Sequence, residues 1–343
     1  MNQTLRSTQA LAEAGLVDPA ELPALEAVAR RYAVAVTPEM AELAVEPGIL
    51  RQFVPSPAEL VETAEENADP IGDDPHSPLP GIVHRYPDRV LLKPLHVCPV
   101  YCRFCFRREM VGPDGRGSLT DGELDAALAY VASRPEIWEV VVTGGDPMLL
   151  SPRRLEKIAA RLDAIAHVKV LRLHTRVPVV EPARVDERLV GALKRFRSAV
   201  FVALHANHPA EFTPAAREAI ARLVDAGIPM ISQSVLLRGV NDDAQTLSAL
   251  MRRFVENRIK PYYLHQGDLA PGTSHFRTGI EEGQALLRAL RGTVSGLCQP
   301  TYVLDIPGGH GKVPVGPGYL EKGEEGWTVS DPNGRTHAYP PKG

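Results

Sequence analysis

Three of the four cysteines lie within eight residues, at Cys98, Cys102 and Cys105, with the spacing C-x3-C-x2-C. Three crowded thiols and a distant fourth make a poor disulfide framework and indicate metal or redox chemistry. A structural zinc site uses four protein ligands, and only three are local here. The fourth cysteine, Cys298, follows a predicted helix in an apolar run, where a buried thiol is expected. The count matches a [4Fe–4S] cluster that keeps one iron open, with a zinc or redox site as the alternative.

A glycine-rich stretch, residues 305–312, reads Asp-Ile-Pro-Gly-Gly-His-Gly-Lys. A nucleotide-binding loop has Ser or Thr after the lysine and a helix next, whereas Val313-Pro314 follows Lys312. Two interpretations stay open from the residues alone. Lys312 is either solvated in a surface turn, or it bonds covalently to a flat carbonyl cofactor that the glycines leave room for.

Six apolar runs alternate with amphipathic stretches after residue 80 and predict parallel strands covered by crossover helices. The predicted strands are residues 89–96, 139–144, 168–174, 199–205, 230–237 and 261–266. Most begin roughly 30 residues apart, the size of one βα unit. The first interval is longer and contains the cysteines. We therefore expect an α/β barrel or partial barrel rather than a doubly wound sheet.

Capping residues and apolar spacing predict the helices. The first 80 residues have helical patterns at 5–14, 19–31 and 57–67; later helices begin after Thr120, Ser151, Asp186 and Thr213, and two more cover 247–254 and 281–293. Pro80-Gly81 is a predicted linker. The expected organisation is an N-terminal helical segment (1–80), a barrel core (81–296) and a C-terminal segment with Lys312 (297–343).

Chemistry in a parallel barrel gathers at the carboxyl ends of the strands. Polar residues predicted there are Asp146, Arg176, His205, Gln233, His265 and Asp268. The adjacent Gly144 and Gly145 indicate a tight turn or a close approach of the backbone.

Composition narrows the class of protein. Of 343 residues, 44% are hydrophobic and 23% charged, which excludes disorder for the chain as a whole. The net charge of −4 argues against nucleic-acid binding. No apolar stretch approaches the ~18 residues of a membrane-spanning helix, and residues 1–20 lack a secretion signal's apolar core. We expect a cytoplasmic protein with no membrane partner.

The cysteine spacing, with Phe104 before the last cysteine, resembles the signature of radical S-adenosylmethionine enzymes. The resemblance implies a partial (β/α)6 barrel in which the three cysteines hold a [4Fe–4S] cluster. It also implies that S-adenosyl-L-methionine chelates the open iron and is cleaved to a 5′-deoxyadenosyl radical. Gly144, Gly145 and Asp146 match the family turn that contacts the methionine amino group.

The Asp305–Lys312 stretch, the cysteine loop and the segment His84–Arg89 together resemble the lysine 2,3-aminomutase family, from about residue 40 to 320. The resemblance implies that pyridoxal 5′-phosphate attaches to Lys312. It places Arg85, Tyr86 and Arg89 along that cofactor, with Arg176 as a further phosphate contact. Guanidinium forks suit a phosphate, although surface arginines before a strand are the plain alternative.

The resemblance also implies a substrate, L-lysine, converted to β-lysine by 2,3-migration of its amino group. Arg107 then holds the α-carboxylate, while Asp268 and Asp305 clamp the distant ammonium. Two carboxylates in one pocket repel each other unless a cation lies between them, which favours lysine over glutamate. Gln233, His265 and His205 are expected near S-adenosylmethionine, the second cofactor or the substrate. An external electron donor such as flavodoxin or ferredoxin is implied.

Departures from the family keep alternatives open. The chain lacks the C-terminal cysteines through which the standard enzyme binds structural zinc, so we expect no zinc and leave a homo-oligomer open. His265 replaces a tyrosine, as in the branch that makes (R)-β-lysine for elongation factor P, although that branch tends to lose the two aspartates. A 2,3-aminomutase for another amino acid is a further alternative. A non-catalytic zinc or iron–sulfur protein is the alternative of a different class.

Overall fold

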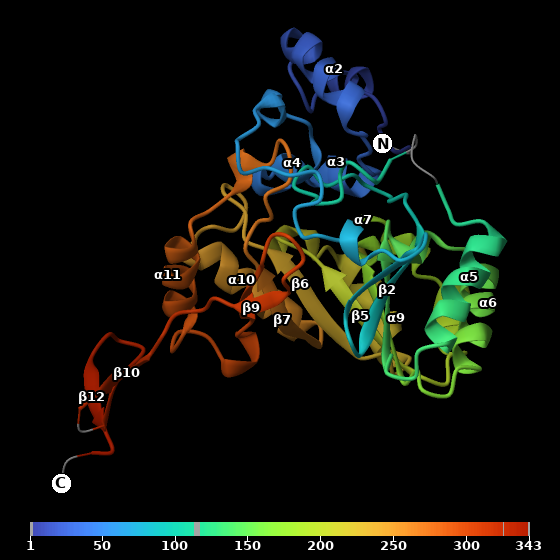
Figure 1. Cartoon of the computed structure of the whole chain (residues 1–343). Helices are drawn as coiled ribbons and strands as arrows, with labels where there is room; N and C mark the ends of the chain where they lie inside the picture. Colours follow the sequence, from blue (N-terminus) through green and yellow to red (C-terminus); the bar gives the residue numbers. More distant parts are fainter. Residues whose placement is uncertain (1–2, 113–116, 325, 342–343) are drawn as a thin grey trace.

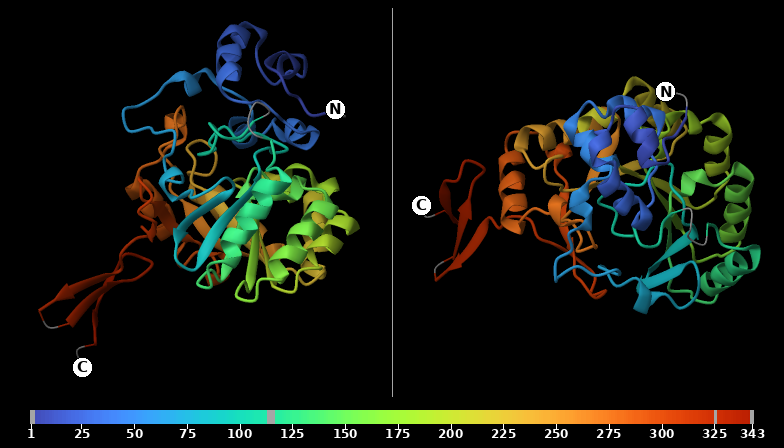
Figure 2. Two further views of the ribbon diagram at one scale, coloured as in Figure 1. Left: turned by 45° about the vertical axis from the view of Figure 1, so that its right-hand side comes forward. Right: turned by 90° about the horizontal axis from the view of Figure 1, so that it is seen from above.

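The central sheet of the computed structural model, which describes residues 3–112, 117–324 and 326–341, has nine strands in sequence order. Seven strands run parallel: β2 (Arg89–Leu95), β3 (Glu139–Gly144), β4 (Val170–Thr175), β5 (Ala199–His205), β6 (Met230–Val235), β7 (Ile259–His265) and β8 (Thr301–Asp305). The sheet curls into a half-barrel (Figure 2). This confirms the predicted α/β partial barrel and its six strands. The seventh parallel strand, β8, was not predicted, because its apolar run was interpreted only as packing around Cys298.

An antiparallel strand closes each edge of the sheet. At one edge β1 (Ile82–Tyr86) forms a hairpin with β2, in which Tyr86 pairs with Arg89. At the other edge β9 (Lys312–Pro314) pairs with β8, so that Lys312 lies opposite Asp305. The backbone N–H of Lys312 donates to the Tyr86 hydroxyl at 2.8 Å and thereby links the two edges. Neither edge strand was predicted from the sequence.

Helices cover the outer face of the curved sheet (Figures 1 and 2). They are α5 (Asp121–Ala132), α6 (Pro152–Asp163), α7 (Val177–Val180), α8 (Glu187–Leu193), α9 (Pro214–Asp225), α10 (Ala244–Glu256) and α11 (Ile280–Leu290). The predicted caps are confirmed: Thr120 and Glu123 form a capping box, and Ser151 and Thr213 each accept a backbone N–H of their helix. Short 3-10 turns connect elements at η4 (Pro147–Leu149), η5 (Pro182–Arg184), η6 (Pro209–Glu211), η7 (Ser274–Phe276) and η8 (Gly296–Cys298).

The N-terminal helices lie across one end of the half-barrel, beside the cysteine loop (Figure 1). They are α1 (Thr8–Glu13), η1 (Pro19–Glu21), α2 (Leu22–Arg31), α3 (Pro38–Leu43) and α4 (Pro47–Phe53), followed by η2 (Pro57–Leu60) and η3 (Asp74–His76). The helix predicted over 57–67 is wrong, because only the single turn η2 forms there. Its Glu59 turns inward to buried arginines, and the N–H of Asn67 donates to the carbonyl of Leu269. Tertiary contacts thus override the helical pattern.

A small antiparallel sheet ends the chain and projects away from the barrel (Figures 1 and 2). Its strands are β10 (Leu320–Gly323), β11 (Gly326–Ser330) and β12 (Thr336–Tyr339). Among the described residues, no helix has the length and apolar character needed to cross a membrane.

Candidate active site

A cavity of about 670 Å³ lies inside the curved sheet. Its wall includes the cysteine loop, the carboxyl ends of the parallel strands, the β1–β2 hairpin and Lys312 of β9. Every residue predicted to bind a cofactor, the substrate or a metal lines this one cavity. The fold therefore gathers residues that are more than 200 positions apart in the chain.

The cysteine loop presents three free thiols, Cys98, Cys102 and Cys105, to the cavity. Burial, the Asp146 carboxylate and the other two thiols raise the pKa of Cys98 well above its ordinary value. Burial and Cys102 raise the pKa of Cys105 to about 11. Thiols that hinder each other's ionisation in this way are suited to a cationic iron–sulfur group, which compensates the thiolates together. Cys298 lies apart in the core at 4% exposure, as predicted.

No three His, Cys, Asp or Glu side chains converge on a single-ion site within the described ranges. In a [4Fe–4S] cluster each cysteine binds a different iron, so its ligands stand farther apart than those of one ion. Cys98, Cys102 and Cys105 lie on one loop and line the same cavity, an arrangement that suits three cluster ligands.

Gly144 and Gly145 let the turn after β3 approach the backbone just before the cysteine loop. The backbone N–H of Gly145 donates to the Leu95 carbonyl at 2.8 Å, and that of Asp146 donates to Val97 at 3.0 Å. A Cβ on Gly145 would stand 2.2 Å from the Val97 carbonyl oxygen, and Gly144 has φ +105°. Only glycine permits this approach.

Asp146 joins the ends of two neighbouring strands. Its carboxylate accepts from the Thr175 hydroxyl and the Arg176 backbone N–H, both at 2.7 Å, and from the N–H of Met148 at 3.0 Å. The Gly-Gly-Asp turn thus holds the cavity edges of β3 and β4 together beside the cysteines.

Glu59 anchors the cysteine loop to the N-terminal segment. Its fully buried carboxylate pairs with Arg103 at 2.6 Å and with Arg108. Burial opposes ionisation of Glu59, but the two guanidiniums outweigh it and hold its pKa below the ordinary value. The sequence did not predict this role, because Glu59 falls within the helix expected over 57–67.

Arg176 lies in this cysteine region, with Cys102, Glu211 and Gln52 as its side-chain partners. The sequence predicted that Arg176 contacts a cofactor phosphate near Arg85, Tyr86 and Lys312. Within the described part of the chain, none of these three residues is a side-chain partner of Arg176.

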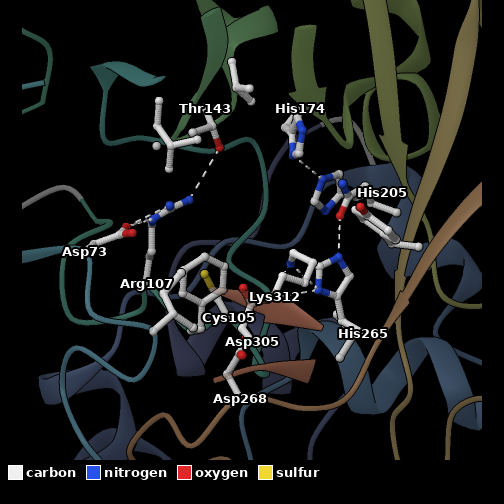
Figure 3. A pocket seen from close by; sticks show the side chains of 18 of the residues that line it. Asp73, Cys105, Arg107, Thr143, His174, His205, His265, Asp268, Asp305 and Lys312 are labelled. Atoms are coloured by element: carbon white, nitrogen blue, oxygen red, sulfur yellow. Dashed lines mark hydrogen bonds and ion pairs between the residues drawn. The ribbon is translucent and has the colours of Figure 1, made fainter. Parts of the chain in front are cut away.

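Lys312 is held by Asp305 and His265 (Figure 3). The Lys312 Nζ donates to Asp305 Oδ2 and lies 3.2 Å from His265 Nδ1, while His265 Nε2 lies 2.5 Å from Gln233 Oε1. Burial lowers the pKa of Lys312, partly offset by Asp305. The pKa of Asp305 is held well below its ordinary value, because hydrogen bonds and charge from His265 and Lys312 outweigh burial. A lysine with a lowered pKa is suited to act as a nucleophilic amine.

Asp268 lies near Asp305 in the cavity (Figure 3). Burial inside the cavity and the charge of Asp305 raise the pKa of Asp268 to about 7. The two carboxylates predicted to clamp a cation are therefore brought together.

Arg107 and Arg85 share a carboxylate that the sequence did not predict, that of Asp73. Arg107 donates to Asp73 Oδ2 at 2.8 and 3.0 Å, and Arg85 donates to Oδ1 at 3.1 Å. Burial opposes ionisation of Asp73, but Arg107, Lys93 and Arg85 hold its pKa below the ordinary value. Asp73 sits in an acidic run of the N-terminal segment, where no local signal marks it as buried.

The β1–β2 hairpin places an aromatic ring beside Lys312. The Tyr86 hydroxyl accepts from the Lys312 backbone, and the Arg89 guanidinium stacks on the Tyr86 ring at 3.8 Å. Arg89 also pairs with Asp88 at 2.7 Å. Arg85 reaches toward Asp305 at 3.8 Å, so the predicted phosphate-binding residues adjoin the Lys312 group.

Two histidines at adjacent strand ends complete the cavity wall. His205 Nε2 lies 3.2 Å from His174 Nδ1 (Figure 3). Burial lowers the pKa of both, to about 3 for His205, so both rings are neutral at pH 7. His174 lies at the carboxyl end of β4, as its place in the sequence predicted, and its pairing with His205 is what the structure adds.

Comparisons with known proteins agree with the fold. The family model described as the radical SAM superfamily matches residues 92–250, and the one described as lysine-2,3-aminomutase matches residues 287–330. An L-lysine 2,3-aminomutase of Acetoanaerobium sticklandii is 43% identical over 272 residues, which cover 79% of this chain and 65% of that protein. The chain thus spans just under two thirds of that relative's length.

Two further relatives are named for different substrates, lysine and glutamate. An L-lysine 2,3-aminomutase of Escherichia coli (strain K12) is 38% identical, with 78% of this chain and 77% of that protein covered. A glutamate 2,3-aminomutase of Clostridioides difficile is 37% identical, with 78% of this chain and 63% of that protein covered. Together with the two family models, these similarities show that the chain belongs to the lysine 2,3-aminomutase family of radical SAM proteins.

Proposed function

We propose that this protein converts L-lysine to β-lysine by moving the amino group from Cα to Cβ. The proposed cofactors are a [4Fe–4S] cluster, S-adenosyl-L-methionine and pyridoxal 5′-phosphate. One observation carries the proposal: a single cavity is lined both by the three-cysteine loop and by Lys312, whose amine lies between Asp305 and His265. The names of the relatives support the same reaction.

The cysteine region is the proposed radical-generating part of the cavity. Cys98, Cys102 and Cys105 hold the cluster, which together with S-adenosylmethionine supplies a 5′-deoxyadenosyl radical when both are bound. The backbone of Gly144 and Gly145 and the side chain of Gln233 face the same space and contact S-adenosylmethionine. The electron comes from an external donor such as flavodoxin or ferredoxin. A need for that donor and for free thiols supports a reducing, cytoplasmic location.

Lys312 is the proposed attachment point of pyridoxal 5′-phosphate, which supplies a conjugated ring able to delocalise an unpaired electron. Arg85, Tyr86 and Arg89 bind along that cofactor. His265 orients the Lys312 amine, and the ionised Asp305 carboxylate accepts a hydrogen bond from that amine.

The aspartate pair is the proposed substrate clamp. In the structure Asp305 pairs with Lys312. In the proposed clamp Asp305 would exchange Lys312 for the ammonium at the far end of the substrate. That ammonium also favours the ionised form of Asp268, whose pKa is raised to about 7 without it. Arg107, oriented by Asp73, binds the α-carboxylate.

Glutamate is the alternative substrate raised by the Clostridioides difficile relative. Its side-chain carboxylate would face Asp268 and Asp305, and three like charges in one cavity repel each other. The aspartate pair therefore favours lysine, or another amino acid with a cationic side chain.

The test uses the anaerobically purified full chain with reconstituted cluster, dithionite and both organic cofactors. We expect about four irons and four sulfides per chain, the composition of one [4Fe–4S] cluster. Chiral chromatography with mass detection should show β-lysine formed from lysine. Glutamate should give no β-glutamate. Product from glutamate but not lysine would overturn the substrate, and stoichiometric zinc without iron would overturn the enzyme class.

A further inference from the structure

Arg176 directs one guanidinium N–H at a cysteine of the proposed cluster. Its Nη1 donates to Cys102 Sγ at 3.2 Å. Its Nη2 donates to Glu211 Oε2 at 2.5 Å and to Gln52 Oε1 at 3.0 Å. Arg176 is 8% exposed, and Glu211 and Gln52 are fully buried. The two hydrogen bonds of Nη2 are therefore shielded from water, and the sulfur that faces Nη1 is partly buried.

Three elements fix the direction of this guanidinium. Gln52 comes from α4, and Glu211 comes from η6, where its Oε1 accepts the backbone N–H of Asn207 at 2.8 Å and of His208 at 2.9 Å. The Arg176 guanidinium also lies 4.9 Å from the ring centre of Phe53 and 5.6 Å from that of Phe104. The aim at Cys102 is thus set before any cluster binds.

The charges around Cys102 are arranged asymmetrically. The Arg176 guanidinium is charged, because arginine stays protonated in proteins. Glu211 neutralises that charge at Nη2, whereas the N–H of Nη1 faces the sulfur. The Arg176–Glu211 pair is neutral as a whole, but its positive guanidinium end faces the Cys102 sulfur.

We propose that Arg176 is a positioning residue that raises the reduction potential of the cluster through its Nη1–H···Sγ hydrogen bond to Cys102. The inference rests on the proposed function, because it takes Cys102 as a cluster ligand. One electron from an external reductant converts the cluster from its 2+ to its 1+ state, and part of the added charge resides on the sulfurs. An N–H donor to a sulfur stabilises that charge, most effectively in a site shielded from water.

The experiment measures the midpoint potential of the reconstituted full-length protein by a dithionite titration followed by electron paramagnetic resonance, without S-adenosylmethionine. Arg176→Met removes both donor and charge, and we expect a more negative midpoint with unchanged iron content. Arg222→Gln is the matched control, because this arginine on α9 donates to the Val185 carbonyl away from the cysteines. Its midpoint should equal that of the wild type.

A second variant predicts the opposite sign. Glu211→Gln keeps a carbonyl that accepts from the backbone but removes the neutralising charge, so Arg176 becomes a net cation beside the cluster and the midpoint rises. A purely structural role would give no such pair of opposite shifts. If Arg176→Met does not retain iron, Arg176→Gln replaces it, again with a lower midpoint expected. Equal midpoints in the wild type and the Arg176 variant overturn this inference, whereas a wild type that binds no iron overturns the proposed function.

Discussion

Two charged regions adjoin the same cavity and differ in how their charges are paired: the cysteine region around Cys98, Cys102 and Cys105, and the lysine region around Lys312. In the cysteine region two buried carboxylates have guanidinium partners: Glu59 pairs with Arg103 and Arg108, and Glu211 pairs with Arg176. The third, Asp146, accepts from the Thr175 hydroxyl and from backbone N–H groups. In the lysine region Asp305 holds Lys312, but Asp268 forms no ion pair within the part of the chain that the structure describes. Burial and the charge of Asp305 raise the pKa of Asp268, and no ion-pair partner offsets them.

The difference distinguishes charges that stabilise the fold through ion pairs from a charge that is available to bind a ligand. A buried ion pair whose charges balance orients the loop that carries it, and removal of one partner is costly. A carboxylate with a raised pKa in a cavity is poised to bind a cation. We therefore expect loss of the Glu59 carboxylate to change folding and cluster retention, and variants in the lysine region to change cofactor and substrate binding.

Lys312→Ala gives the largest expected effect. Without the amine, the absorbance of covalently bound pyridoxal phosphate disappears, and β-lysine formation falls by roughly 10³-fold or more, as when a nucleophile is deleted. Both are measured on protein with unchanged iron content. Lys157→Ala, at an exposed ion pair on α6, is the control. An unchanged spectrum would remove Lys312 from this role.

Glu59→Gln tests the scaffold side of the comparison. Arg103 and Arg108 are then left buried without a full counter-charge, which should lower the free energy of unfolding by about 3–5 kcal/mol and reduce iron retention. Urea denaturation measures the first quantity. The exposed pair Arg238–Glu282 supplies the control, since Glu282→Gln should leave the free energy of unfolding nearly unchanged. Equal costs for the two variants would contradict the distinction.

Asp268→Asn tests the ligand side. Loss of the charge should weaken lysine binding by about 10- to 100-fold, the range of a charged hydrogen bond. The ligand-free protein should instead become more stable at pH 8. Since the folded pKa of about 7 exceeds the ordinary 3.8, the ionised carboxylate destabilises the fold increasingly as pH rises through that window. Equilibrium lysine binding and thermal melting check the two signs; a loss of stability would make Asp268 a scaffold charge.

The pH dependence of lysine binding should show the smallest effect. Asp268 must lose its proton to bind an ammonium, so lysine affinity should rise as pH increases toward 7, by up to about tenfold per unit below it, and then level off. Binding is measured from pH 6 to 8, and the same titration of Asp268→Asn should lack this rise. A slope that persists in the variant would assign the titration to another group.

Local patterns predicted the frame of the molecule well. Capping residues such as Thr120 and Ser151 and the apolar runs of β2 to β7 depend on neighbours within a few residues, which the sequence displays directly. The helix expected over 57–67 failed for the opposite reason, because Glu59 finds its partners 44 and 49 positions away in the cysteine loop.

The sequence by itself singled out the groups to which we assign the chemistry: the three spaced cysteines, the glycine-rich turn with Lys312, and the aspartates Asp268 and Asp305. Only the tertiary structure decided their partners. Asp73 at the arginines, Glu211 behind Arg176 and His174 beside His205 were found by their contacts in the fold. The reason is physical. Side-chain type sets what a group can do, but burial and long-range pairing set its charge and direction, and both arise when distant segments meet around one cavity.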